Sequence, residues 1–324
     1  MNLKFIICLL LSFPLLLGSC HHKDLIYDAS PNLRVRLVFD WQNAPDASPE
    51  SMAAYFFPVT TSLPIDYEGE AIRFIFPDIS GGTIRLPFGY FAALGMNSDN
   101  TDWAVLRNAE GLESFEVCTG EAESLAVLGV PVHSLPRKEG SNERIVKTPG
   151  MTWGCRTDDI LLRPSMTDAE KEIVLYPEER VCHYTVDIYN VKNLQYLTGE
   201  EVDASLSGMA EGHVVGKNQA SATQATMSMV MTKDLKDSSL HSEFLTFGVR
   251  PDASPDHILK VYTILEDGSK WIYNADVTDQ VAKAPDPQHV HIVLRSLEFP
   301  QPIVSGGLVP DVDEWQSVNI DIKM

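Results

Sequence analysis

Short strand-like runs separated by turn residues constrain the fold of this chain more than any other feature. Apolar and polar side chains alternate over much of residues 33–41 (LRVRLVFDW), as they do in a half-buried strand. Turn residues interrupt such runs roughly every 8–12 residues, a spacing typical of antiparallel β-sandwiches. Long helices do not alternate with these runs, which argues against a Rossmann fold or an α/β barrel. We therefore predict an all-β fold built of antiparallel β-sandwiches.

The expected strands cover most of the chain after its N-terminal region. They are 33–41, 53–59, 71–76, 81–99 (two strands around a Pro-Phe-Gly turn), 103–108, 112–118, 173–191, 193–199, 204–216, 225–231, 243–249, 257–265, 271–278, 289–297 and 318–324. Residues 266–269 (Glu-Asp-Gly-Ser) predict a tight type I′ hairpin, because Asp-Gly accepts the positive φ values of that turn. Only residues 121–129 and 166–173 look helical, and residues 133–165 look irregular.

The length of the chain predicts two domains. The chain has 324 residues, of which 44% are hydrophobic, so each half can bury its own core. The expected organisation is a signal peptide at 1–19, a polar tether at 20–32, an N-terminal sandwich at 33–170 and a C-terminal sandwich at 171–324.

The N-terminus has the form of a bacterial lipoprotein signal. Lys4 precedes an apolar run at residues 5–17, which is too short to span a bilayer. Leu17-Gly18-Ser19-Cys20 then matches a lipobox. We expect cleavage between Ser19 and Cys20, followed by acylation of Cys20. The alternative is an ordinary secretory signal that ends near a cysteine.

Charge and motifs exclude several classes of function. The formal net charge of −20 argues against nucleic acid as a partner. The sequence contains no G-x-S-x-G elbow, H-E-x-x-H motif, P-loop or G-x-G-x-x-G motif. We expect no catalytic residues, no metal and no cofactor. A hydrolase is the remote alternative, and it needs a pocket with paired carboxylates.

Three clusters of polar residues contain possible metal ligands, and we interpret all three as polar surface. His289 and His291 project from one face of a strand, but two histidines need a third ligand. Asp311, Asp313 and Glu314 lie beside a turn without the spacing or the central glycine of an EF-hand loop. Asp158-Asp159 is interpreted in the same way.

Tryptophan and cysteine residues are expected to pack in the core. The five tryptophans are scattered rather than clustered, so core or domain-interface packing is favoured over a carbohydrate platform. Cys118, Cys155 and Cys182 remain after the signal and the lipid site, and no C-x-x-C spacing occurs. We favour three buried, reduced thiols, with a Cys155–Cys182 disulfide as the alternative.

Several long segments resemble a family of fimbrillin-like envelope lipoproteins from anaerobic gut bacteria, related to the subunits of type V pili. These segments are 35–58, 83–97 (TIRLPFGYFAALGMN), 256–303 and 306–322. The resemblance implies two transthyretin-like β-sandwiches in tandem and no catalytic residues. Polymerising fimbrillins are cut after a loop arginine, whereas Arg34 and Arg36 lie inside a predicted strand. An anchor, tip or stand-alone subunit therefore fits better than a stalk subunit.

Together these features predict a lipid-anchored, non-enzymatic adhesin or pilus accessory subunit that acts through β-strand addition. We expect outer-membrane lipid as a partner through acylated Cys20, with the protein exposed at the cell surface. The periplasmic face is the alternative location. Pilus subunits and surface glycans are the other expected partners, and a glycan- or ligand-binding lipoprotein is the alternative function.

Overall fold

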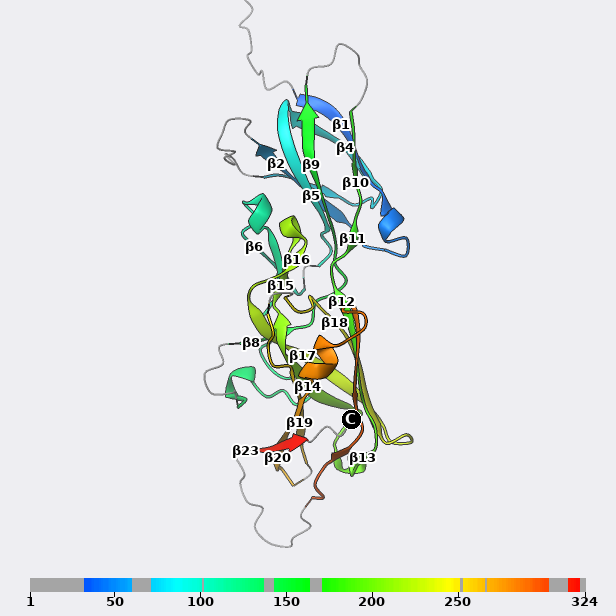
Figure 1. Ribbon diagram of the computed structural model, residues 1–324, viewed down its shortest axis with the longest axis vertical. Coiled ribbons are helices and arrows are strands. Elements are labelled where there is room, and N and C mark those ends of the chain that lie inside the picture. The colour runs from blue at the N-terminus through cyan, green and yellow to red at the C-terminus, as the bar shows by residue number, and fades with distance from the viewer. Residues whose placement is uncertain are drawn as a thin grey trace, which may run out of the picture.

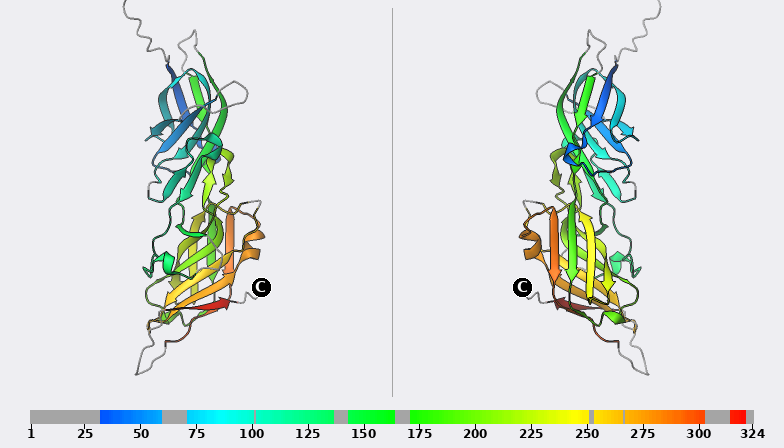
Figure 2. Two further views of the ribbon diagram at one scale, coloured as in Figure 1. Left: turned by 90° about the vertical axis from the view of Figure 1, so that its left-hand side faces the viewer. Right: turned by 90° about the vertical axis from the view of Figure 1, so that its right-hand side faces the viewer.

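The computed structural model of the chain describes residues 32–59, 71–100, 102–136, 143–163, 171–250, 253–265, 267–302 and 314–320. These residues form an elongated molecule with two β-rich lobes, one above the other in Figure 1 and seen from both sides in Figure 2. Strands dominate the described part, and its α-helical content is one short helix, α2 (Thr278–Ala282). The predicted all-β fold is confirmed.

Two facing sheets form the sandwich of the N-terminal lobe. Sheet A has the order β10 (Lys171–Leu175), β1 (Asn32–Phe39), β4 (Gly81–Pro87). Sheet B has the order β11 (Glu178–Glu179), β9 (Trp153–Leu162), β5 (Gly89–Asn97), β2 (Met52–Val59), β3 (Ile72–Phe76). The alternation along β1 has the expected effect, because Val35, Leu37 and Phe39 are buried while Arg34 and Arg36 lie on the other face.

A third sheet covers the outer face of sheet B. Sheet C has the order β16 (Gln219–Ala220), β15 (Gly212–Val214), β7 (Glu116–Thr119), β6 (Ala104–Arg107). Tyr55 and Phe57 of β2 pack against Phe115, just before β7, with ring centroids 4.7 and 6.4 Å apart. Two 3₁₀ turns, η2 (Leu112–Ser114) and η5 (Val215–Lys217), lie at the ends of these strands.

The C-terminal lobe is built on one long, curved sheet around its own core. Sheet D has the order β21 (His289–Leu294), β12 (Cys182–Ile188), β18 (Ser239–Thr246), β17 (Gln224–Asp234), β14 (Glu201–Ala210), β19 (Ile258–Ile264), β20 (Lys270–Asp276), β23 (Trp315–Ile320). β8 (Arg144–Lys147) also pairs with β17, and β13 (Val191–Lys192) pairs with β22 (Leu297–Glu298). The remaining 3₁₀ turns are η1 (Trp41–Asn43), η3 (Val132–Ser134) and η4 (Leu194–Tyr196).

The sheets mix strands from both sides of the expected boundary between residues 170 and 171. β10 lies after that boundary and pairs with β1, while β8 lies before it and pairs with β17. Sheet C takes two strands from each half of the sequence. The division at residue 170 stays a prediction, and the lobes are joined by several passages of the chain rather than by one linker.

Both expected helices are wrong where the structure describes them. Residues 121–129 form isolated bridges and a turn, in which the amides of Val127 and Leu128 donate to the buried carboxylate of Asp203 at 2.7–3.1 Å. These tertiary hydrogen bonds outweigh the local helix propensity. Residues 166–170 lie outside the described ranges. Residues 171–173 belong to strand β10, where Ile173 fills the N-terminal core.

The segment 133–165, expected to be irregular, contains β8 and the ten-residue strand β9. The sequence of β9 (WGCRTDDILL) lacks a clean alternation of apolar and polar residues. This irregular pattern matches a register shift in the pairing of β9 with β5, where Asp159 adopts a φ of +60°. Pairing with its neighbours therefore imposes this strand.

The tight hairpin between β19 and β20 is confirmed, because Leu265 N donates to Ser269 O and Gly268 N donates to Leu265 O. The type I′ geometry is wrong, since Gly268 has a positive φ and Asp267 does not.

A buried ion cluster joins sheets C and D where β14 continues into β15. Glu211 has a side chain only 1% exposed, and Arg107 of β6 donates to both of its carboxylate oxygens at 2.7 and 3.1 Å. Arg144 of β8 pairs with the same carboxylate. The backbone of Glu211 also accepts a hydrogen bond from Thr119 and donates one to Thr223.

We predict that Glu211→Gln lowers the free energy of unfolding by roughly 2–4 kcal/mol, because it leaves two arginines around an uncharged group in a largely buried site. Urea denaturation followed by circular dichroism measures the effect. The matched control is Glu298→Gln, which breaks an exposed pair with Lys192 and should cost less than about 1 kcal/mol. Equal losses in the two variants would contradict the role given to Glu211.

Candidate functional site

Strand β3 leaves one edge of sheet B open. It pairs with β2 on one side, and within the described ranges no strand pairs with its other side. Its sequence, IRFIF, contains no lysine or proline, and its register with β2 has no bulge. Natural proteins use those devices to protect sheet edges from pairing with other chains.

The side chains of β3 make this edge apolar on both faces. Ile75 is 58% exposed, while Ile72 and Phe74 are half-buried at the margin of the N-terminal core. The guanidinium of Arg73 lies over the ring of Tyr55, 5.5 Å from its centroid, so the one charge on β3 is held against sheet B. A strand added beside β3 would cover the exposed apolar surface of Ile75.

Strand β1, in contrast, is paired on both sides. It lies between β4 and β10, and Val35 and Leu37 are fully buried. Arg34 and Arg36 lie inside this strand, as the sequence predicted. β1 is thus a central part of the sandwich.

The lipobox residues Leu17, Gly18, Ser19 and Cys20 lie outside the described residues, so their roles stay predictions. Within the described part of the chain, none of the helices has the length and apolar character needed to cross a membrane.

The histidines singled out in the sequence face solvent on β21 and are paired with carboxylates. His291 Nε2 lies 2.7 Å from Asp187, which also contacts His241 Nδ1 at 2.8 Å. Burial opposes ionisation of Asp187, but these two hydrogen bonds hold its pKa below the usual value. His289 contacts Asp286 at 2.9 Å. Among the described residues, no three His, Cys, Asp or Glu side chains are grouped to hold a metal ion.

Of the other acidic residues considered as metal ligands, some lie in the described part of the chain and some lie outside it. Asp311 and Asp313 lie outside the described ranges, whereas Glu314 directly precedes β23. Asp158 forms an exposed ion pair with Arg156 at 3.0 Å. These contacts agree with the interpretation as polar surface.

The tryptophans pack as the sequence predicted. All five are buried or half-buried. Four of them pack against the hydrophobic clusters: Trp41, Trp103, Trp271 and Trp315. The fifth, Trp153, is buried against Trp41. Trp41 meets Trp153 edge to face at 6.2 Å and donates to the carbonyl of Ile79. They do not form a shared exposed platform for a sugar ring.

The three cysteines are free thiols, so the alternative Cys155–Cys182 disulfide is wrong. Burial raises the pKa of Cys118 and of Cys155 to about 12, and that of Cys182 to about 11. Thiols with such pKa values are protonated and unreactive at neutral pH.

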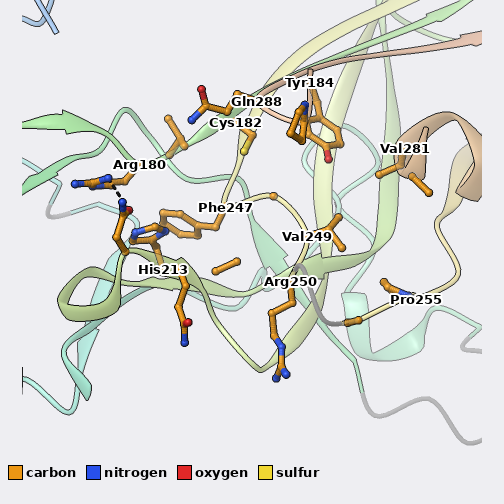
Figure 3. A pocket seen from close by; sticks show the side chains of 18 of the residues that line it. Arg180, Cys182, Tyr184, His213, Phe247, Val249, Arg250, Pro255, Val281 and Gln288 are labelled. Atoms are coloured by element: carbon orange, nitrogen blue, oxygen red, sulfur yellow. Dashed lines mark hydrogen bonds between the residues drawn. The ribbon is translucent and has the colours of Figure 1, made fainter. Parts of the chain in front are cut away.

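A cleft at the junction of the lobes is a further feature that sequence reasoning missed. It has a volume of about 1020 Å³ and brings together residues 178–184, 213–220, 247–250, 253–257 and 278–288 (Figure 3). On its wall, His213 lies between Arg180 and Phe247, whose ring centroid is 6.4 Å from the imidazole. Because these segments are distant in sequence, no local motif could have revealed the site.

Charges in the wall of the cleft are paired with one another. Arg180 donates to the carbonyl of Gly154, to Glu178 and to the side-chain oxygen of Asn218. Glu179 contacts His183. Burial, reinforced by the charge of Arg180, lowers the pKa of His213 to about 4, so its ring is neutral at pH 7.

The sequence of the chain matches one known protein family. A family model described as a domain of unknown function, DUF5119, matches residues 19–230. No curated protein matches the chain.

Three solved structures are similar to this chain, and the first of them shares its fold. A candidate adhesin from Bacteroides ovatus superposes with a TM-score of 0.65 at 20% identity, covering 88% of this chain and 98% of that one. A second candidate adhesin from Bacteroides ovatus has a TM-score of 0.47 at 12% identity, with 82% and 87% covered. The fimbrial anchor protein Mfa2 from Porphyromonas gingivalis has a TM-score of 0.47 at 11% identity, with 82% and 90% covered. The expected likeness to an uncharacterised family is confirmed by the family match, and the first structure shares the fold.

We predict that acid destabilises the protein partly through His213. Its pKa falls from 6.5 to about 4 on folding, so its contribution is complete above pH 6.5 and is lost as the pH falls through about 4. The full loss amounts to roughly 3 kcal/mol. Urea denaturation of His213→Gln should show a shallower decline between pH 6.5 and 4 than the wild type. An identical decline in both proteins would contradict this assignment.

Proposed function

Since this chain belongs to the DUF5119 family and shares its fold with a candidate adhesin, we propose that it is a non-enzymatic adhesin or pilus anchor or accessory subunit of the cell envelope. It acts by accepting an extended segment of a partner as an additional strand. The observation that carries this proposal is the open, apolar edge of sheet B at β3.

The proposed contact combines two kinds of interaction. Main-chain hydrogen bonds along the outer edge of β3 give affinity, as in other cases of β-strand addition. Burial of Ile75, and further burial of Ile72 and Phe74, favours a partner strand with apolar residues on both faces. Arg73, beside the aromatic ring of Tyr55, favours an acidic residue in the facing strand.

The proposed role is that of an anchor, tip or stand-alone protein rather than a stalk subunit. β1 is paired on both edges and its apolar side chains are fully buried, so its removal would open the core of the lobe. Its arginines lie within the strand rather than in a loop.

A lipid anchor at Cys20 completes the proposal. The family match begins at Ser19, where we expect the signal peptide to end. Two or more acyl chains on Cys20, at about 0.8 kcal/mol per buried CH₂, hold a protein stably in a membrane. The polar segment after Cys20 then leads to β1 and holds the lobes away from an outer membrane, with surface exposure expected and the periplasmic face as the alternative.

The hydrolase alternative has little support in the cleft. Its adjacent carboxylates are both engaged, Glu178 with Arg180 and Glu179 with His183.

We predict that Ile75→Lys abolishes capture of a partner strand, because a lysine at a sheet edge disfavours pairing. Material sheared from whole cells and run in SDS without boiling should show resistant complexes for the wild type and a several-fold loss for the variant. Leu235→Lys is the matched control, since Leu235 is also 58% exposed but lies in the turn after β17. The proposal would be contradicted if Ile75→Lys formed as many SDS-resistant complexes as the wild type, or if the wild type ran only as a monomer.

We predict that Cys20→Ala moves the protein out of the membrane fraction, because no acyl chain can then be attached. Fractionation and labelling of cells with radioactive palmitate provide the measurement. Cys182→Ala, which removes a half-buried thiol, serves as the control and should leave both label and fraction unchanged. Palmitate incorporation that persists in Cys20→Ala would show that the anchor lies elsewhere.

A further inference from the structure

The cleft between the lobes has the dimensions of a ligand site. Its volume of about 1020 Å³ lies at the upper end of the range of roughly 300–1,000 Å³ found for small-molecule pockets. Its walls come from the passage between β11 and β12, the β15–β16 end of sheet C, the connection after β18, and helix α2. Sites formed between two folded units in this way are common places for ligands.

A buried polar atom in the wall of the cleft lacks a partner. His213 is only 7% exposed, and its Nε2 has no hydrogen-bond partner among the described residues. Buried polar atoms are nearly always paired in native proteins, so an unpaired one in a cleft points to a group supplied by a ligand. A neutral imidazole nitrogen pairs with a hydroxyl or an amide.

The charges of the cleft argue against an ionic ligand. Arg180 is committed to Glu178 and to two oxygen acceptors of the chain, and Glu179 is committed to His183. Arg250 also lines the cleft, and it is not without a partner in the chain either. A charged ligand would therefore have to compete with these internal pairs, or be desolvated without a partner of its own. An uncharged ligand avoids both costs.

The remaining lining groups suit a polyhydroxylated ligand. The carboxamides of Gln219 and Gln288 are exposed at the rim, and each offers both a donor and an acceptor to a hydroxyl group. Among the apolar lining residues, Val249 is half-buried and offers surface to the C–H groups of a sugar ring, whereas Phe247 and Val281 are buried and complete the wall. This mixture of apolar lining and a few polar groups is typical of small-ligand sites.

A peptide fits the cleft less well than a sugar. The strand edges in its described wall are β11 and β16, which contain only two residues each, so little main-chain pairing is available to an extended peptide. We propose that the cleft binds a short, uncharged oligosaccharide, with His213 as a hydrogen-bonding contact. This site is separate from β3 and does not depend on strand addition.

The test is isothermal titration of the full-length lipoprotein, in a detergent without a sugar headgroup, with neutral oligosaccharides of two to six hexose or N-acetylhexosamine units. We expect at least one of them to bind the wild type. Ala282→Trp fills the cleft from an exposed position on α2 and should weaken binding at least about tenfold. Lys283→Trp is the matched control, because Lys283 follows Ala282 in the sequence but does not line the cleft. The Lys283→Trp variant should bind the oligosaccharide as tightly as the wild type does.

His213→Phe tests the individual contact, because it keeps an aromatic ring beside Phe247 and removes Nε2. We expect about a fivefold or greater loss of affinity. The proposal is overturned if no neutral oligosaccharide binds, if only anionic glycans or peptides bind, or if Ala282→Trp binds as tightly as the wild type. None of these results bears on the edge of β3, which the shear assay of Ile75→Lys tests separately.

Discussion

The buried carboxylate of Glu211 is the interaction on which the arrangement of the two lobes depends. It lies where the chain leaves sheet D for sheet C, and it is neutralised by Arg107 from one sheet and Arg144 from the other. A charge with a side chain 1% exposed is tolerable only with such partners. The cluster therefore links three strands from distant parts of the sequence and fixes the junction that shapes the cleft around His213.

The two surfaces assigned to function differ in how they recognise a partner. β3 offers main-chain groups and apolar side chains, a contact suited to any extended segment of the right pattern. The cleft offers the unpaired nitrogen of His213 and two rim carboxamides around an apolar wall, a contact suited to one class of small ligand. Under the two proposals, the edge of β3 joins the protein to other envelope proteins and the cleft joins it to a sugar.

The sequence predicted those parts of the fold that depend on local pattern. The alternation of β1, the burial of the tryptophans and the all-β class all follow from side-chain periodicity. β9 and the turn at 126–128 did not follow from it, because pairing with β5 and hydrogen bonds to Asp203 decide their conformations. The open edge of β3 and the cleft were equally hidden, since strand order and the meeting of Arg180, His213 and Phe247 are set by long-range contacts.

The central claim is that a partner strand pairs with β3, and hydrogen–deuterium exchange tests it most directly. Complexes released from cells by shear would be compared with dissociated monomer, with exchange followed over residues 72–76. The account predicts slow exchange of the outward-facing β3 amides in the complex and fast exchange in the monomer, with the amides of β1 slow in both. Fast exchange of β3 in the complex would contradict it, because those amides would then be without a partner strand.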